Sequence, residues 1–198
     1  MAWALDKRND MAGRDKKSLP NRGVRGLRPI LVRRAPGRPH QGLLFFGPRA
    51  CRVALGRSGL AVLKREGDGT TPIGRFSLRQ ILYRADRGPR PRSPLPLRAI
   101  RRYDGWCEDP SDQNYNRLVK LSPRHDGDRL TRDDHLYDLI IVLGYNDAPR
   151  VRGRGSAIFV HLARKGYAPT AGCIGLSRHD LLMMLAQARR GSRIVVTR

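Results

Sequence analysis

A histidine and a cysteine, twelve residues apart, have the residue types and the surroundings needed for nucleophilic chemistry. His161 ends the apolar run 157–160, and Cys173 follows Gly172 in a turn-rich segment. A thiol becomes a strong nucleophile when a neighbouring imidazole takes its proton. Gly172 allows a tight turn in which backbone N–H groups near Cys173 face a developing oxyanion. Spacing alone leaves a second interpretation open, in which the cysteine is a small apolar core residue and the histidine a satisfied polar group.

Two elements would position this pair. Residues 157–161 predict a strand that ends at His161. Ser177, followed three residues later by Asp180, predicts the N-cap of a helix that Gly191 ends. Cys173 would then lie just before a helix N-terminus, which favours the thiolate. We therefore expect a thiol pKa below the value of about 8.5 for free cysteine.

The rest of the chain predicts mostly short strands. Their apolar or alternating runs are residues 30–32, 43–46, 51–55, 60–64, 76–78, 136–145 and 193–197. The Ile-Ile-Val-Leu run within 136–145 predicts a strand that is buried on both faces. Residues 86–116 predict an irregular insertion, in which Trp106 either caps a substrate cleft or belongs to the core. Together these elements predict a mainly β fold, a sandwich or barrel, with one main helix.

Composition limits the class of protein. The 198 residues carry 40 Lys and Arg against 17 Asp and Glu, a net charge of +23. Residues 1–28 predict a basic disordered tail that makes loose contact with polyanions, and residues 29–198 predict one catalytic domain. We expect no transmembrane segment, because no apolar run approaches 18 residues. The three cysteines form no CxxC pair and no zinc-finger spacing with histidine, so we expect no metal site and no cofactor.

Two motif blocks resemble a known family. The first block consists of His161, Thr170, Gly172, Cys173, Ile174 and Leu176. It is similar to the signature of the L,D-transpeptidase (YkuD-like) catalytic domain family: a histidine, a spacer, then Ser/Thr-His-Gly-Cys-Ile-Arg-Leu. The second block is Lys64 with residues 69–76, Gly-Thr-Thr-Pro-Ile-Gly-Arg-Phe, and resembles the family's Lys…Gly-x-x-Thr-Pro-x-Gly-x-Phe segment. The resemblance covers about residues 30–198.

The resemblance implies acyl transfer on peptidoglycan stem peptides. Cys173 would attack the carbonyl on the diamino-acid side of a stem and expel the terminal D-alanine, with His161 as general base and then general acid. Thr170 or a backbone carbonyl would orient the imidazole, with Gly172 at the oxyanion. An amine acceptor would give a crosslink and water would give L,D-carboxypeptidase activity. Attachment of another protein to the wall is a third outcome that the sequence leaves open.

The sequence departs from the family pattern at two positions beside the thiol. Ala171 stands where the family often has histidine, and Gly175 stands where it usually has arginine. The first departure removes a hydrogen-bonding group, and the second removes a charge that helps hold the site or bind a substrate carboxylate. Both bear on substrate preference and rate.

Two other functions remain as alternatives. A sortase-like cysteine transpeptidase also places histidine before cysteine on a β fold, but it expects a longer gap and an arginine after the cysteine strand, which Arg178 matches poorly. A basic nucleic-acid-binding module expects aromatic residues interleaved with arginine, whereas 6% of this chain is aromatic.

Location and assembly are less constrained. The resemblance implies the periplasm or the cell wall, yet no secretory signal is visible at the start of this chain. A misassigned start, an atypical export route and a cytosolic role all stay open, as does the oligomeric state.

Overall fold

A computed structural model describes residues 29–122 and 127–198. The tail expected over residues 1–28 lies outside these residues. The first strands are β1 (Ile30–Ala35), β2 (Arg38–Phe46), β3 (Arg49–Ala54), β4 (Leu60–Ala61), β5 (Thr71–Pro72), β6 (Gly74–Tyr83) and β7 (Leu97–Ala99). They are followed by β8 (Asp104–Trp106), β9 (Leu118–Lys120), β10 (Asp128–Arg129), β11 (Leu139–Leu143), β12 (Phe159–Leu162), β13 (Ile174–Leu176) and β14 (Arg193–Thr197). A 3-10 turn spans Lys165–Tyr167, and helix α1 spans Arg178–Gln187.

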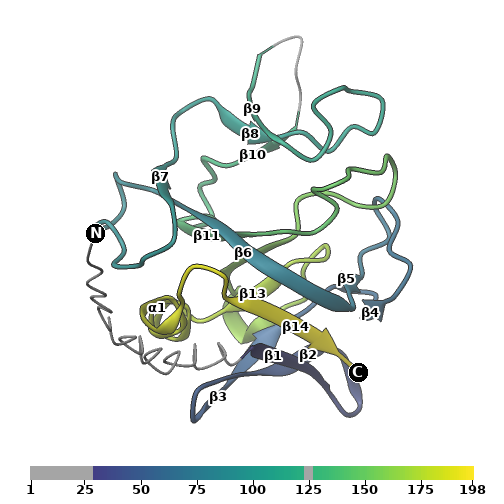
Figure 1. The fold of residues 1–198 in the computed structure, drawn as a ribbon, viewed down its shortest axis with the longest axis vertical. Helices are drawn as coiled ribbons and strands as arrows, with labels where there is room; N and C mark the ends of the chain where they lie inside the picture. The colour runs from purple at the N-terminus through teal and green to yellow at the C-terminus, as the bar shows by residue number, and fades with distance from the viewer. Residues whose placement is uncertain (1–28, 123–126) are drawn as a thin grey trace, which may run out of the picture.

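The strands form a barrel-like sheet with a smaller sheet at one end. The main sheet has nine strands in the order β11-β12-β13-β3-β2-β1-β14-β6-β7, and an additional β11–β6 pairing closes it on itself. The three-stranded sheet β10-β8-β9 lies at the opposite end of the molecule from β1, β2 and β3 (Figure 1). The predicted mainly β fold with one main helix is confirmed for the described part of the chain.

Strand β11 separates two hydrophobic cores. Side chains of successive residues point to opposite faces of a strand. Accordingly Leu139, Ile141 and Leu143 enter the barrel core, where they join the buried face of α1. Ile140 and Val142 enter a second core, which faces the three-stranded sheet. The prediction of a strand buried on both faces is confirmed.

Several element boundaries differ from the expectation. The strand expected over 60–64 is reduced to the two residues of β4, and Lys64 leaves it to enter a turn. The insertion 86–116 is not wholly irregular, because β7 pairs with β6 and β8 pairs with β9 and β10. Among residues 29–122 and 127–198, no helix has the length and apolar character needed to span a bilayer.

Helix α1 begins as predicted but ends earlier. The Ser177 side chain accepts a hydrogen bond from the amide of Asp180 at 3.1 Å, so the predicted N-cap is confirmed. The helix stops at Gln187, because Ala188 is already extended (φ −63°, ψ 148°). Gly191, with φ of 86°, therefore serves the turn before β14 and not the helix end. Strand β13 also separates Cys173 from the helix.

Candidate active site

His161 reaches the site because of the alternation along β12. Phe159 and His161 share the face toward the second core, while Val160 and Leu162 enter the barrel core. The imidazole is buried, and its Nδ1 lies 2.8 Å from the carbonyl oxygen of Leu162. A carbonyl only accepts hydrogen bonds, so Nδ1 carries the proton and Nε2 keeps a free lone pair. Of the two expected orienting groups, the backbone carbonyl therefore has this contact and Thr170 does not.

Thr170 holds the turn that carries the cysteine. Its hydroxyl donates to the carbonyl of Cys173 at 2.7 Å and accepts from the amide of Gly172 at 3.1 Å. Gly172 has φ of 145°, a conformation that favours glycine. The amide of Thr170 donates to the carbonyl of Leu55 at 2.9 Å, and its carbonyl accepts from the amide of Arg57 at 2.8 Å. These bonds fix the turn against the segment that follows β3.

The thiol of Cys173 is buried in a polar backbone environment. Its Sγ lies 3.1 Å from the carbonyl oxygen of Ala157, to which it donates, and 3.4 Å from the amide nitrogen of Phe159. Burial raises the pKa of Cys173 to about 12. This direction is opposite to the one expected from a helix N-terminus, because β13 intervenes and burial removes the water that would stabilise a thiolate.

The imidazole is also neutral at rest. Burial lowers the pKa of His161 to about 4, because a buried imidazolium loses its hydration. The resting pair is therefore a neutral thiol and a neutral imidazole, and not a thiolate–imidazolium ion pair. Among the described residues, no hydrogen bond joins the two side chains directly. A neutral His161 with a free Nε2 can act as a base without first losing a proton.

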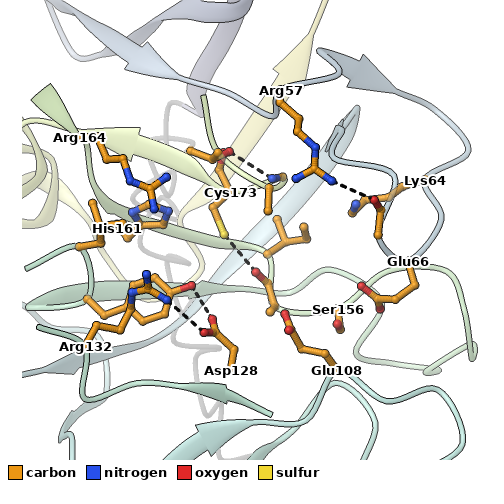
Figure 2. A pocket seen from close by; sticks show the side chains of 18 of the residues that line it. Arg57, Lys64, Glu66, Glu108, Asp128, Arg132, Ser156, His161, Arg164 and Cys173 are labelled. Atoms are coloured by element: carbon orange, nitrogen blue, oxygen red, sulfur yellow. Dashed lines mark hydrogen bonds and ion pairs between the residues drawn. The ribbon is translucent and has the colours of Figure 1, made fainter. Parts of the chain in front are cut away.

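One cavity contains both side chains. It has a volume of about 310 Å³, and Cys173, His161, Gly172 and Thr170 all line it. Figure 2 shows Cys173 with His161, Arg132 and Arg164 on one side and Arg57, Lys64 and Glu66 on the other. The charged side chains that line the cavity are Arg57, Lys64, Glu66, Glu108, Asp128, Arg132 and Arg164. The sequence interpretation assigned a site role to none of these, although Lys64 belongs to the second motif block.

A tyrosine connects the imidazole to the acidic side of the cavity. The rings of Tyr137 and His161 meet edge to face, with centroids 5.4 Å apart. The Tyr137 hydroxyl donates to the carboxylate of Asp128 at 2.6 Å. Burial raises the pKa of Asp128. Burial, together with Asp128 and Glu66, raises the pKa of Glu108 to about 7. The cavity thus holds one carboxyl group, that of Glu108, which changes charge near neutral pH beside a neutral dyad.

The two motif blocks meet at the turn before β13. The hydroxyl of Thr71 accepts a hydrogen bond from the amide of Gly56 at 2.8 Å and lies 3.5 Å from the carbonyl of Cys173. Trp106, in contrast, does not line the cavity. Its buried indole packs edge to face on Phe159 at 5.0 Å and donates to Asn116 at 2.9 Å. The structure thus places Trp106 in the second core, because a fully packed aromatic leaves no face for a substrate.

Comparisons with known proteins give one family. The family described as the L,D-transpeptidase catalytic domain (YkuD) matches residues 40–196. No curated protein matches the chain. A solved L,D-transpeptidase from Mycobacterium tuberculosis H37Rv aligns at 12% identity and a TM-score of 0.39 over 85% of this chain and 57% of its own. L,D-transpeptidase 3 from Mycobacterium tuberculosis aligns at 12% identity and a TM-score of 0.40, over 85% of this chain and 61% of its own. An L,D-transpeptidase from Mycobacterium smegmatis aligns at 16% identity and a TM-score of 0.38, over 85% of this chain and 58% of its own. This chain thus spans less than two thirds of each of these structures.

Proposed function

The chain belongs to the family of L,D-transpeptidase catalytic domains, and from this membership we propose that it performs cysteine-dependent acyl transfer on peptidoglycan stem peptides. The observation that carries the proposal is that Cys173 and His161 line one cavity, with the imidazole nitrogen Nε2 free to accept a proton. Both side chains are neutral at rest, so the base is already in its active form at neutral pH.

The reaction begins with transfer of the thiol proton to Nε2 of His161 as Sγ attacks the substrate carbonyl. A carbon–sulfur bond forms, and the carbonyl oxygen becomes an oxyanion. The C–N bond to the terminal D-alanine then breaks, and the imidazolium returns its proton to the leaving amine. Coupling proton transfer to attack avoids a free thiolate in surroundings that disfavour it.

The thioester is then resolved by an acceptor. An amine from a second stem attacks the thioester carbonyl and loses a proton to His161, and the carbon–sulfur bond breaks as Cys173 recovers that proton. The product is a crosslink between the stems. With water as the acceptor, the same steps give L,D-carboxypeptidase activity. Both outcomes place the protein on the periplasmic or cell-wall side of the inner membrane, where the stems are found.

Thr170 and Gly172 support the nucleophile in this proposal. The amide of Gly172 is used by Thr170, so we assign the oxyanion contact to the amide of Cys173 itself. Thr170 bonds to the peptide groups on both sides of that amide, through the Gly172 amide and the Cys173 carbonyl, and so limits its direction. Its role is therefore to position the turn.

The test is mass spectrometry of muropeptides incubated with the pure protein. The wild type should form L,D-crosslinks or tetrapeptides shortened to tripeptides, and Cys173→Ala should form neither. His161→Gln should lose turnover while keeping the fold, as judged by circular dichroism. Unchanged muropeptides with folded wild-type protein would rule out this function for the chain alone.

A further inference from the structure

Lys64 is a buried charge on the cavity wall. Its side chain is 3% exposed, and its Nζ lies 2.7 Å from Oδ1 of Asp68. Burial of an ammonium costs free energy unless the charge is paired, so the Asp68 contact accounts for its stability. The pairing alone does not explain why the ammonium faces the cavity that contains Cys173.

Two glycines lie beside this lysine. At Gly155, where φ is 94°, an added Cβ would lie 2.9 Å from Cε of Lys64. At Gly172, an added Cβ would lie 3.4 Å from Nζ of Lys64. The stem of the lysine thus passes Gly155, and its ammonium lies near Gly172, the residue before the nucleophile.

Asp68 fixes the ammonium in this place. Its carboxylate accepts from Lys64 Nζ, from the amides of Arg65 and Thr70 at 2.7 and 2.8 Å, and from the Thr70 hydroxyl at 2.9 Å. Burial alone would raise the pKa of Asp68, but these hydrogen bonds outweigh it and lower that pKa to about 2. Asp68 therefore stays charged over the whole neutral range.

The other cations of the cavity are more exposed to solvent. The side chains of Arg132 and Arg164 are 32% and 50% exposed and share Asp134, and Arg57 is exposed as well. Solvent and salt screen exposed charges much more than buried ones. Lys64 is thus the cavity cation, among the described residues, that solvent screens least, while Asp68 at 2.7 Å opposes part of its field.

The nucleophile needs such a charge. Burial raises the pKa of Cys173, and Asp128 and Glu108 add to this effect, while the hydrogen bond from the Phe159 amide and, to a smaller extent, the charge of Lys64 lower it. The family signature has histidine and arginine at the positions of Ala171 and Gly175. At Gly175 a Cβ would lie 3.2 Å from Cα of Ala163 and from Cβ of Ala54, so a side chain there would require these neighbours to move by a few tenths of an ångström.

Resting on the acyl transfer proposed above, we propose that Lys64 is an electrostatic positioning residue, whose ammonium stabilises the negative charge that develops at Cys173 during attack. Asp68 and the two glycines hold the ammonium in place, so its field is present before the substrate arrives. This chain keeps the lysine of the second motif block, although residues 171 and 175 carry no charge.

Alkylation of Cys173 by iodoacetamide tests this without peptidoglycan. The thiolate displaces iodide, so the rate at a fixed pH below the thiol pKa follows the thiolate fraction. At pH 8, peptide mapping of Lys64→Met should show alkylation at Cys173 slowed roughly tenfold, equivalent to one pKa unit. Lys64→Arg should restore the rate to within about threefold, because it keeps the charge.

A matched control removes one positive charge elsewhere. Arg79 is ion-paired with Asp147 at 2.7 Å and does not line the cavity, so Arg79→Met should alkylate Cys173 at the wild-type rate. Lys64→Gln keeps a donor toward Asp68 and replaces the methionine variant if that one does not fold. It should be slowed by the same factor.

The outcomes separate this proposal from its competitors. Wild-type alkylation in a folded, neutral Lys64 variant would overturn it. A raised KM with unchanged alkylation would also overturn it, because Lys64 would then bind a substrate carboxylate. Absence of crosslinking by the wild type would count against the acyl-transfer function and would leave the alkylation comparison intact.

Discussion

The hydroxyl of Thr170 bonds to both residues that precede β13: it donates to the carbonyl of Cys173 at 2.7 Å and accepts from the amide of Gly172 at 3.1 Å. All three residues are buried. The direction of the Cys173 backbone therefore depends on one side chain that is itself bonded to the segment after β3.

Replacement of Thr170 by valine keeps the shape and removes both hydrogen bonds. Unpaired polar groups would remain at buried positions, so Thr170→Val should lower the free energy of unfolding by about 1–3 kcal/mol. Crosslinking should fall further than the folded fraction does, because the Cys173 amide loses its direction. Urea unfolding and muropeptide analysis measure the two effects. Thr170→Ser keeps the hydroxyl and should retain both stability and crosslinking activity. Equal activity in the valine and serine variants would contradict the positioning role.

The buried imidazole makes stability depend on pH. The pKa of His161 is about 4 in the fold and 6.5 as the reference for the unfolded chain, so the unfolded chain binds the extra proton between these values. The contribution of His161 to the free energy of unfolding is fully present above pH 6.5, and about 3 kcal/mol of it should be lost as the pH drops toward 4. Urea unfolding of the wild type and of His161→Gln at pH 7 and pH 4.5 isolates this effect. Parallel losses in the two proteins would show that another group is responsible.

The thiol should react slowly and without an inflection near neutral pH. Burial raises the pKa of Cys173 to about 12, so its alkylation rate should rise about tenfold per pH unit from pH 6 to pH 9. Burial also raises the pKa of Cys51, to about 12, and the pKa of Cys107. Cys173 lines the cavity and should be modified first, including by a carbapenem, as the family resemblance suggests. A plateau below pH 8.5, or first modification at Cys51, would refute this assignment.

The pKa of Cys173 is raised although the sequence predicted a lowered value, which shows where local sequence patterns stop being informative. The continuous apolar run Ile-Ile-Val-Leu within 136–145 predicted a doubly buried strand, because burial on both faces leaves a local signature. The His161–Cys173 pair and the family were found from the motif blocks, and the match over 40–196 confirms the family. The sign of the Cys173 pKa shift depends on how deep the thiol lies, and the apolar run before it indicates nothing about that depth.

The charged cavity wall was missed for a related reason. Glu108 follows β8, Asp128 lies in β10 and Arg132 lies shortly after β10, all within or beyond a segment that appeared irregular. These side chains meet because β8 pairs with β10, a contact between strands more than twenty residues apart. Neither hydrophobic periodicity nor turn signals encode that pairing. Trp106 was ambiguous for the same reason, because its neighbour Phe159 lies far away in the sequence.

The N-cap of α1 supports the helix more than the nucleophile. Ser177→Ala removes the bond to the Asp180 amide and should lower the free energy of unfolding by about 0.5–2 kcal/mol. Because β13 separates the helix from Cys173, alkylation of Cys173 in the folded variant should stay within about twofold of wild type. Ser177→Thr keeps an acceptor and should be close to wild type in stability. A large loss of reactivity at full stability would mean that the helix start acts on the thiol.

Gly172 has a backbone conformation that favours glycine and lies too close to a neighbouring backbone atom to carry a side chain. Its φ of 145° disfavours other residues, and an added Cβ would lie 2.8 Å from the carbonyl oxygen of Thr70. Because that oxygen belongs to backbone, Gly172→Ala should shift the turn beside Lys64. It should lower the free energy of unfolding by more than the conformational change alone, about 2–4 kcal/mol. Crosslinking should be lost even in the fraction of molecules that folds.

Gly37 provides the matched control for this substitution. It has φ of 69° in the turn between β1 and β2, and an added Cβ there would meet nothing within 4 Å. Gly37→Ala should therefore lower the free energy of unfolding by about 1 kcal/mol, because only its backbone conformation is unfavourable. Alkylation and crosslinking should stay unchanged. The difference between the two variants in urea unfolding measures the steric part at Gly172. If Gly172→Ala is no less stable or active than Gly37→Ala, the turn before Cys173 tolerates a side chain, and the close approach of Lys64 to that turn is not required.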